Sequence, residues 1–171
     1  MRFFDFPPEI RNLIYMYLQP TGKTIKPIFT IDSRHNGKSV ASFTFPAKVF
    51  NVSRAFDKEA ATVFFSQNIF SFNSPYSCFD FMERIGNFKS ASLQFIEMER
   101  FIHGSQSAQS LAQKCPQLKR IEFGDVEPTG SNGEWAMNTL ECIQALALAL
   151  PHLGQISYVK VAGRLDRKSV V

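Results

Sequence analysis

Residues of the types that perform catalysis are few in this chain, and their spacing forms no complete site. The three histidines, His35, His103 and His152, lie in predicted loops or turns, and none has a Cys, Asp or Glu at metal-ligand spacing. His103 and Ser105 are close in sequence, but a nucleophile and its base are recognised by their geometry in space rather than by adjacency. The histidines therefore predict no metal centre and no catalytic pair.

Two other patterns that can hold ligands are incomplete. Glu97 and Glu99 alternate on a predicted strand, which puts both carboxylates on one face without further ligands for a cation. The stretch GSNGEW lacks the lysine and the strand–helix context of a phosphate-binding loop. We expect a non-catalytic protein with no metal and no cofactor. The alternative is an enzyme whose pocket gathers polar groups around His103, Glu97 or Glu99.

Composition indicates a globular protein of one domain or slightly more. The 171 residues are 44% apolar and 20% charged, and the 18 phenylalanines are expected mainly in the core. The net charge of +4 is dispersed along the chain, which disfavours nucleic acid as a partner. Nucleic-acid binding would require one shared basic face of Lys119, Arg120, Lys160, Arg164, Arg167 and Lys168.

The expected location is the cytoplasm or nucleus. Cys78, Cys115 and Cys142 are odd in number and far apart, which predicts reduced thiols. The N-terminus has no signal-peptide pattern, and no apolar run reaches the roughly 18 residues of a membrane span. The longest such run, IQALALALPHL, is interrupted by Pro151.

The first predicted element is a helix that begins at Pro7–Pro8 and ends before Pro20. Proline is tolerated in the first turn, and Glu9 there suits the positive end of the helix dipole. Apolar residues recur at helical spacing and form one face, made of Ile10, Leu13, Ile14, Tyr17 and Leu18.

Strands and further helices follow. Asn36–Gly37 predicts a tight turn, and hence a β-hairpin of 24–31 with 39–45, whose first strand lies at an edge because of Pro27. A second helix is predicted over 47–66, with Val49, Val52 and Phe56 in its apolar stripe, then a short strand IFSF. A third helix is predicted from Ser74–Pro75 to Ile85, ended by Gly86.

A weak repeat occupies the second half of the chain. The segments LQFIEM, LKRIEF and LGQISY align Leu93, Leu118 and Leu153, and they also align Ile96, Ile121 and Ile156 as well as Met98, Phe123 and Tyr158. Helix ends closed by proline precede the second and third segments. Helix–strand units at this period are typical of leucine-rich or related α/β solenoids. A plain parallel sheet with crossover helices gives the same local pattern, and the sequence leaves both open.

The opening residues FFDFPPEIRNLIYMYLQP resemble the first helix of an F-box, with Phe6 where Leu is typical. The closer resemblance is to fungal F-box-like proteins, including those called two-ExR domain proteins. These have a later segment similar to VSRAFDKEAATVFFSQNIFSF, usually with Cys in place of Ser53, and a stretch like FDFMERIG. The resemblance covers about residues 3–20 and 47–98.

Together, the predicted elements and the resemblance lead us to expect an α/β fold in three regions. Residues 1–72 form F-box-like helices with an inserted β-hairpin. Residues 73–163 form helix–strand units, resembling a short leucine-rich-repeat-like solenoid or small parallel sheet, packed on them. Residues 164–171 form a frayed basic tail.

The function implied by this resemblance is that of a non-catalytic adaptor. It docks on a Skp1-like protein and presents an unknown protein substrate for ubiquitination. The alternative is an F-box-derived scaffold that does not bind Skp1, since the hairpin separates helices that an F-box keeps together. Because three Phe rings are unfavourable in water, the N-terminal residues are expected to meet a partner or fold back. The predicted partner-binding residues are Phe3, Phe4, Phe6, Pro7, Pro8, Glu9, Ile10, Leu13 and Tyr17.

Overall fold

The structure is a computed structural model that describes residues 2–19, 21–27, 29–32, 40–43, 53–99, 105–123 and 132–158. Within these ranges, side chains are described except at 29–32, 40–43, 132–139 and 158. The predictions that involve His35, His103, Val49, Val52 and the basic tail lie outside the described residues.

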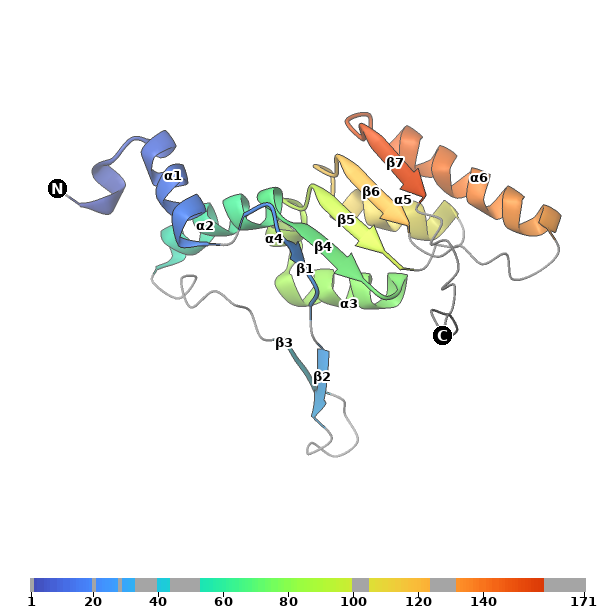
Figure 1. Ribbon diagram of the computed structural model, residues 1–171, viewed down its shortest axis with the longest axis horizontal. Coiled ribbons are helices and arrows are strands. Elements are labelled where there is room, and N and C mark those ends of the chain that lie inside the picture. Colours follow the sequence, from blue (N-terminus) through green and yellow to red (C-terminus); the bar gives the residue numbers. More distant parts are fainter. Residues whose placement is uncertain are drawn as a thin grey trace, which may run out of the picture.

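A five-stranded parallel sheet organises the chain, in the order β1-β4-β5-β6-β7 (Figure 1). Its strands are β1 (Thr24–Ile25), β4 (Ile69–Phe72), β5 (Phe95–Met98), β6 (Arg120–Phe123) and β7 (Gln155–Tyr158). The connecting helices are α3 (Pro75–Ile85), α4 (Asn87–Ser90), α5 (Ser105–Lys114) and α6 (Asn132–Ala149). The predicted α/β class is confirmed. From β4 onward, each connection leads to the next strand along the sheet, always in the same direction. Because such connections are right-handed, their helices lie on one face of the sheet.

The sequence repeat corresponds to neighbouring strands in register. Ile96 pairs with Ile121, which pairs in turn with Ile156. The turns before these strands also match, because the N–H groups of Leu93, Leu118 and Leu153 each donate to the carbonyl three residues earlier, at 3.0–3.1 Å. The alignment of the three segments made from the sequence is therefore confirmed. Helix α4 was not predicted.

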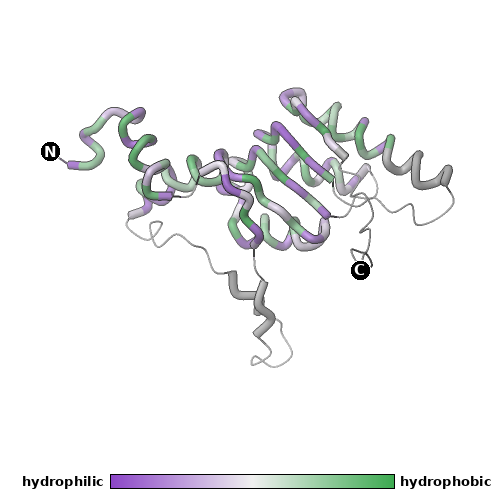
Figure 2. Tube along the Cα trace, viewed as in Figure 1, coloured by the Kyte–Doolittle hydropathy of each residue, from purple (hydrophilic) through white to green (hydrophobic). Residues whose placement is uncertain are grey.

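The main core lies between the sheet and its helices. Alternate strand residues such as Ile96, Met98 and Phe123 are buried, while Phe95 and Glu97 lie on the other face. Figure 2 shows both hydrophobic and hydrophilic positions along the strands. Phenylalanine rings fill the centre with centroids 5.3–6.4 Å apart, and the described rings of this group are Phe64, Phe65, Phe70, Phe72 and Phe81. Most of the described phenylalanines are core residues, as expected.

Three elements precede or flank the sheet: the short 3-10 helix η1 (Phe3–Asp5), α1 (Pro8–Leu18) and α2 (Arg54–Gln67). Helix α1 begins at the predicted prolines. The prediction that the second helix begins at 47 is wrong, because Ser53 is its N-cap and accepts a hydrogen bond from the Phe56 N–H at 3.2 Å. A serine side chain that satisfies a first-turn N–H marks a helix start more strongly than a preceding proline.

The hairpin is confirmed in β2 (Phe29–Asp32) and β3 (Val40–Phe43), which pair antiparallel. The prediction that residues 24–31 form one strand of it is wrong, since β1 pairs parallel with β4 at the sheet edge. Contacts from Asn68 and Ile69 hold Lys23, the residue before β1, beside the start of β4. The buried Asn68 side chain accepts from the Lys23 N–H at 3.0 Å, and the Ile69 N–H donates to the Lys23 carbonyl at 2.9 Å.

The glycine that ends α3 provides a test of the fold. Gly86 has φ 80° and ψ 163°, a conformation that is essentially restricted to glycine, and a Cβ added there would meet no other atom within 4 Å. Gly86→Ala should lower the free energy of unfolding by about 1–3 kcal/mol through backbone strain alone.

Gly154→Ala is the matched control, because a Cβ there would make only an ordinary 3.7 Å contact with the Lys119 carbonyl. It should change stability by less than about 1 kcal/mol. Urea denaturation measures both variants, and equal losses would contradict the assigned strain.

Candidate protein-interaction surface on helix α1

A three-residue network fixes α1 against α2. The Arg11 guanidinium donates from Nε and Nη2 to the two carboxylate oxygens of Glu59, each at 2.9 Å. The Tyr15 hydroxyl donates to the same carboxylate at 3.0 Å. A further Arg11 nitrogen, Nη1, donates to the Phe6 carbonyl at 2.6 Å, which holds the segment before α1 in place. Paired donation of this kind defines orientation as well as contact.

The charges of the network stabilise one another. The Arg11 guanidinium holds the pKa of the Glu59 carboxyl below its ordinary value; the Tyr15 hydroxyl adds to this, while partial burial opposes it. The hydrogen bond to Glu59 correspondingly raises the pKa of Arg11. Burial is the main reason that the pKa of Tyr15 is raised. At neutral pH the network is therefore a carboxylate held by a cation and a protonated phenol.

A small aromatic cluster lies beside the network. Tyr15, the fully buried residue of α1, contacts the Phe56 ring edge-on with centroids 4.9 Å apart. Phe3 packs on both rings, at 5.5 Å and 5.4 Å, and Ala60 completes the cluster. The side of α1 that carries Arg11 and Tyr15, four residues apart, therefore faces α2.

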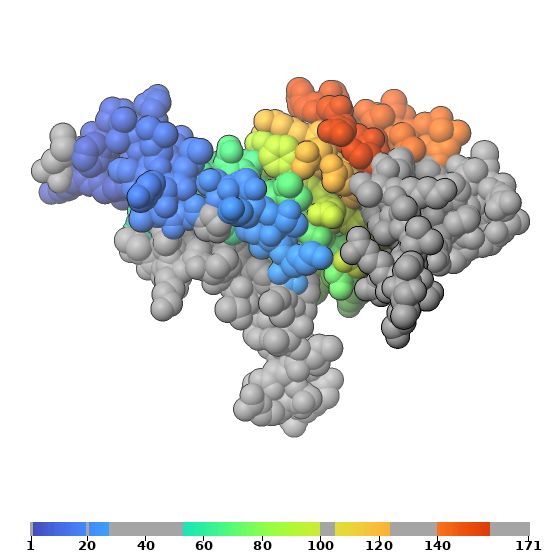
Figure 3. All heavy atoms as spheres, viewed as in Figure 1, coloured from blue at the N-terminus to red at the C-terminus, as the bar shows by residue number. Residues whose placement is uncertain are grey.

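The opposite side of α1 exposes large apolar side chains, beside which the polar Glu9 and Asn12 are also exposed. Ile10, Leu13 and Tyr17 follow helical spacing there and are 42%, 61% and 93% exposed, and Met16 lies beside them. We call these four residues the α1 outer surface. Leu18 and Phe4 are about half exposed. Figure 3 shows this N-terminal region, in dark blue, at one end of the molecule and away from the last strands of the sheet.

The structure divides the residues predicted to bind a partner into two groups. Phe3 packs inward, Phe6 is partly buried, and Phe4 is covered in part by the Arg11 guanidinium, 5.7 Å from its ring centre. The exposed members are Phe4, Pro7, Pro8, Glu9, Ile10, Leu13 and Tyr17. Phe3 thus supplies an inner contact, and the helix itself supplies the outer surface.

Sequence reasoning missed the residues that decide this orientation. Arg11, Tyr15, Phe56 and Glu59 were not predicted as a group, and Met16 was not named. One feature of the sequence could have indicated this group. Arg11 and Tyr15 are at positions i and i+4 of α1, and α2 carries the acidic residue Glu59. This spacing is informative only once α1 and α2 are known to pack together. Arg11 and Glu59 are 48 positions apart in sequence, and nothing in the sequence shows that they meet.

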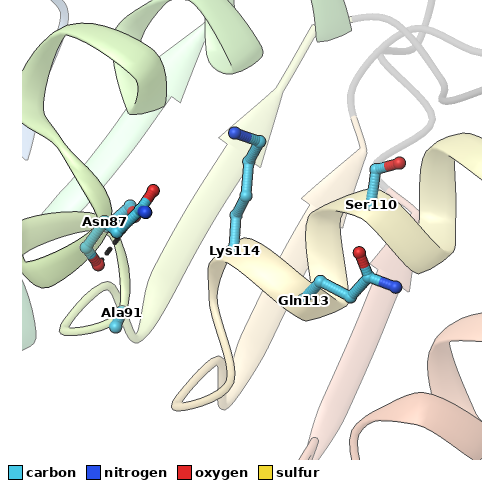
Figure 4. A pocket seen from close by; sticks show the side chains of 6 residues that line it. Asn87, Ala91, Ser110, Gln113 and Lys114 are labelled. Carbon is cyan, nitrogen blue, oxygen red and sulfur yellow. Dashed lines mark hydrogen bonds between the residues drawn. The ribbon is translucent and has the colours of Figure 1, made fainter.

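A shallow surface depression of about 430 Å³ lies between α4 and α5, lined by Asn87, Ser90, Ala91, Ser110, Gln113 and Lys114. Figure 4 shows the side chains of Lys114 and Gln113 extending from α5 in different directions. Lys114 forms an ion pair with Glu83, and Ser90 donates to the Asn87 carbonyl. These polar groups bind one another or diverge, so they supply no convergent catalytic set.

The two acidic residues considered as part of an alternative site have different neighbours. Glu97 is next to Glu122 across β5 and β6, and Glu99 pairs instead with Lys26 at 3.6 Å. The described residues contain no group of three or more His, Cys, Asp or Glu side chains that could hold a metal ion.

The cysteines are free and buried. Burial raises the pKa of Cys115 to about 12 and that of Cys142 to about 11, and it raises that of Cys78 well above its ordinary value. Thiols with raised pKa values are poor nucleophiles at neutral pH.

In comparisons with known proteins, no family profile, no curated protein and no solved structure matches the chain. Among the described residues, no helix has the length and apolar character needed to cross a membrane.

The lowered pKa of Glu59 predicts a pH-dependent stability. Stability from a carboxylate whose pKa is lower when folded is present above its ordinary value of 4.5 and is lost as the pH falls through the folded pKa. Glu59→Gln should therefore be less stable than the wild type at pH 7, with a smaller difference at pH 3. Urea unfolding followed by near-ultraviolet circular dichroism measures this, and a difference independent of pH would contradict it.

Proposed function

We propose that this chain is a non-catalytic, F-box-like protein-interaction adaptor. In this proposal the α1 outer surface docks on a Skp1-like protein, and the helix–strand region presents a protein substrate for ubiquitination in the cytoplasm or nucleus. The observation that carries the proposal is the exposed row of Ile10, Leu13 and Tyr17 on a helix whose opposite side is already held by α2.

Energetic considerations support a docking role. Burying apolar surface is worth about 25 cal/mol per Å², and a fully buried large side chain contributes roughly 1.5–3 kcal/mol. Ile10, Leu13 and Tyr17 are exposed together, so burying them against a partner would contribute several kcal/mol to the free energy of binding. Aromatic residues like Tyr17 are also typical anchors of protein interfaces. Since α1 is fixed against α2, its outer surface requires no rearrangement before a partner meets it.

The arrangement of α1 and α2 supports the F-box-like part of the proposal. The resemblance covers these two helices, and the predicted hairpin between them raised the question of whether they still meet. They do pack together, through Arg11, Tyr15 and Glu59, although the hairpin lies between them in sequence. The insertion is therefore compatible with a two-helix docking unit.

The second part of the proposal concerns the helix–strand region. Strands in chain order, with matching turns before β5, β6 and β7, support a short leucine-rich-repeat-like unit. Such a unit offers a continuous surface on which a substrate can be held. The alternative proposal is a scaffold that uses the same α1 surface for another protein and does not bind Skp1.

Type-matched substitutions test the docking surface. Leu13→Ala and Tyr17→Ala should each weaken binding to purified Skp1 by about 1–3 kcal/mol, a roughly fivefold to 150-fold rise in Kd. The controls are Leu148→Ala on α6 and Tyr76→Ala on α3, since these residues are 86% and 83% exposed outside the surface. The controls should bind as the wild type does, and isothermal titration calorimetry gives the affinities.

Two results would count against the proposal. If the wild-type chain does not bind Skp1, the ubiquitin-ligase role fails and the scaffold alternative remains. If Skp1 binds but the control substitutions weaken it as much as Leu13→Ala and Tyr17→Ala do, the α1 outer surface is not the docking site.

A further inference from the structure

The buried apolar side chains of the described residues form two separate clusters. The large one joins the sheet to α2, α3, α5 and α6. The small one contains Tyr15, Phe56 and Ala60, with Phe3 and Val63 partly buried against it. Helix α1 contributes to the small cluster only, so its attachment relies on few side chains and on the bridge to Glu59.

Helix α2 is anchored independently of α1. Its second half places Ala61, Phe64 and Phe65 in the large cluster. Its first half is held by α4, through an ion pair of Lys89 with Asp57 at 3.0 Å and a contact of the Lys58 ammonium with the Phe88 ring at 5.5 Å. Removal of α1 would therefore leave α2 attached along its length.

The link from α1 to the sheet is held at its sheet end, because the Gly22 N–H donates to the Gln67 carbonyl at 2.9 Å. This contact keeps the end of the link on α2, so an opening of α1 is confined to the residues before it. Gln19, which follows the last residue of α1, is only 5% exposed, and neither polar atom of its side-chain amide has a hydrogen-bond partner among the described residues. A buried amide without partners opposes the closed position of α1.

From these observations we infer that η1 and α1 form a clasp that opens from α2 as a separate unit while the sheet and α2 stay folded. The Arg11–Glu59 bridge and the Tyr15 cluster hold the clasp closed, and the buried Gln19 amide favours opening. Local openings of this kind require less free energy than global unfolding, because they expose little buried surface.

The clasp has a consequence for binding that rests on the proposed function. A partner that recognises the α1 outer surface in its fixed position binds the closed form. Its apparent affinity then falls in proportion to the fraction of closed molecules. The test of the clasp uses the chain alone, so failure of the clasp and failure of the docking proposal are distinguishable.

Native-state hydrogen exchange, read by mass spectrometry at increasing low urea concentrations, tests the clasp. Amides of α1 should be at least about tenfold less protected than those of β5 and β6. Their protection should depend weakly on urea, because the urea dependence scales with the surface exposed on opening. Protection of α1 equal to that of the sheet, with the same urea dependence, would overturn the inference.

Variants with opposite expected effects sharpen the test. Arg11→Lys keeps the charge but loses the paired geometry, so α1 protection should fall by about fivefold or more while β5 and β6 are unchanged. Gln19→Met removes the unpaired amide and should raise α1 protection. Arg84→Lys, in the ion pair with Asp80 on α3, is the matched control and should leave α1 unchanged.

The outcome is decisive in either direction. Opposite shifts confined to α1 support a clasp, and a loss of protection spread equally over α1 and the sheet contradicts it.

Discussion

One charged contact, from Arg11 to Glu59, sets the orientation of the N-terminal helix. Because a guanidinium must lie in the plane of the carboxylate to bind both of its oxygens, the bridge fixes the rotation of α1 as well as its position. Successive residues of a helix are turned by about 100°. Holding Arg11 and Tyr15 inward therefore places Ile10, Leu13 and Tyr17 outward, although these are the more apolar residues.

Helix α2 connects the two parts of the molecule. Phe56 and Ala60 belong to the small aromatic cluster, and Phe64 and Phe65 belong to the main core. A single rigid helix thus carries α1 at one end and the sheet at the other. The hairpin of β2 and β3 lies between α1 and α2 in sequence, but their packing depends on side-chain contacts in space and tolerates the insertion.

The fold could be predicted wherever local chemistry is strong. Ser74–Pro75 and Gly86 define the bounds of α3, and the aligned Ile96, Ile121 and Ile156 give the register of three strands. Prediction failed where a residue distant in sequence determines which strands pair. Nothing between 24 and 31 reveals that Asn68 binds the Lys23 N–H and that β1 pairs with β4 in the parallel sheet.

For the candidate site, the sequence by itself determined that α1 is a helix with an apolar stripe, because prolines start it and the spacing of Ile10, Leu13 and Tyr17 is intrinsic to the chain. Only the tertiary structure decided which side of that helix is buried. The stripe and the Arg11–Tyr15 side compete for α2, and the outcome depends on where α2 presents Glu59 and Phe56. The ion pair and the ring contacts each join a residue of α1 to a residue of α2. They therefore depend on how the two helices pack, and the sequence of either helix alone does not determine them.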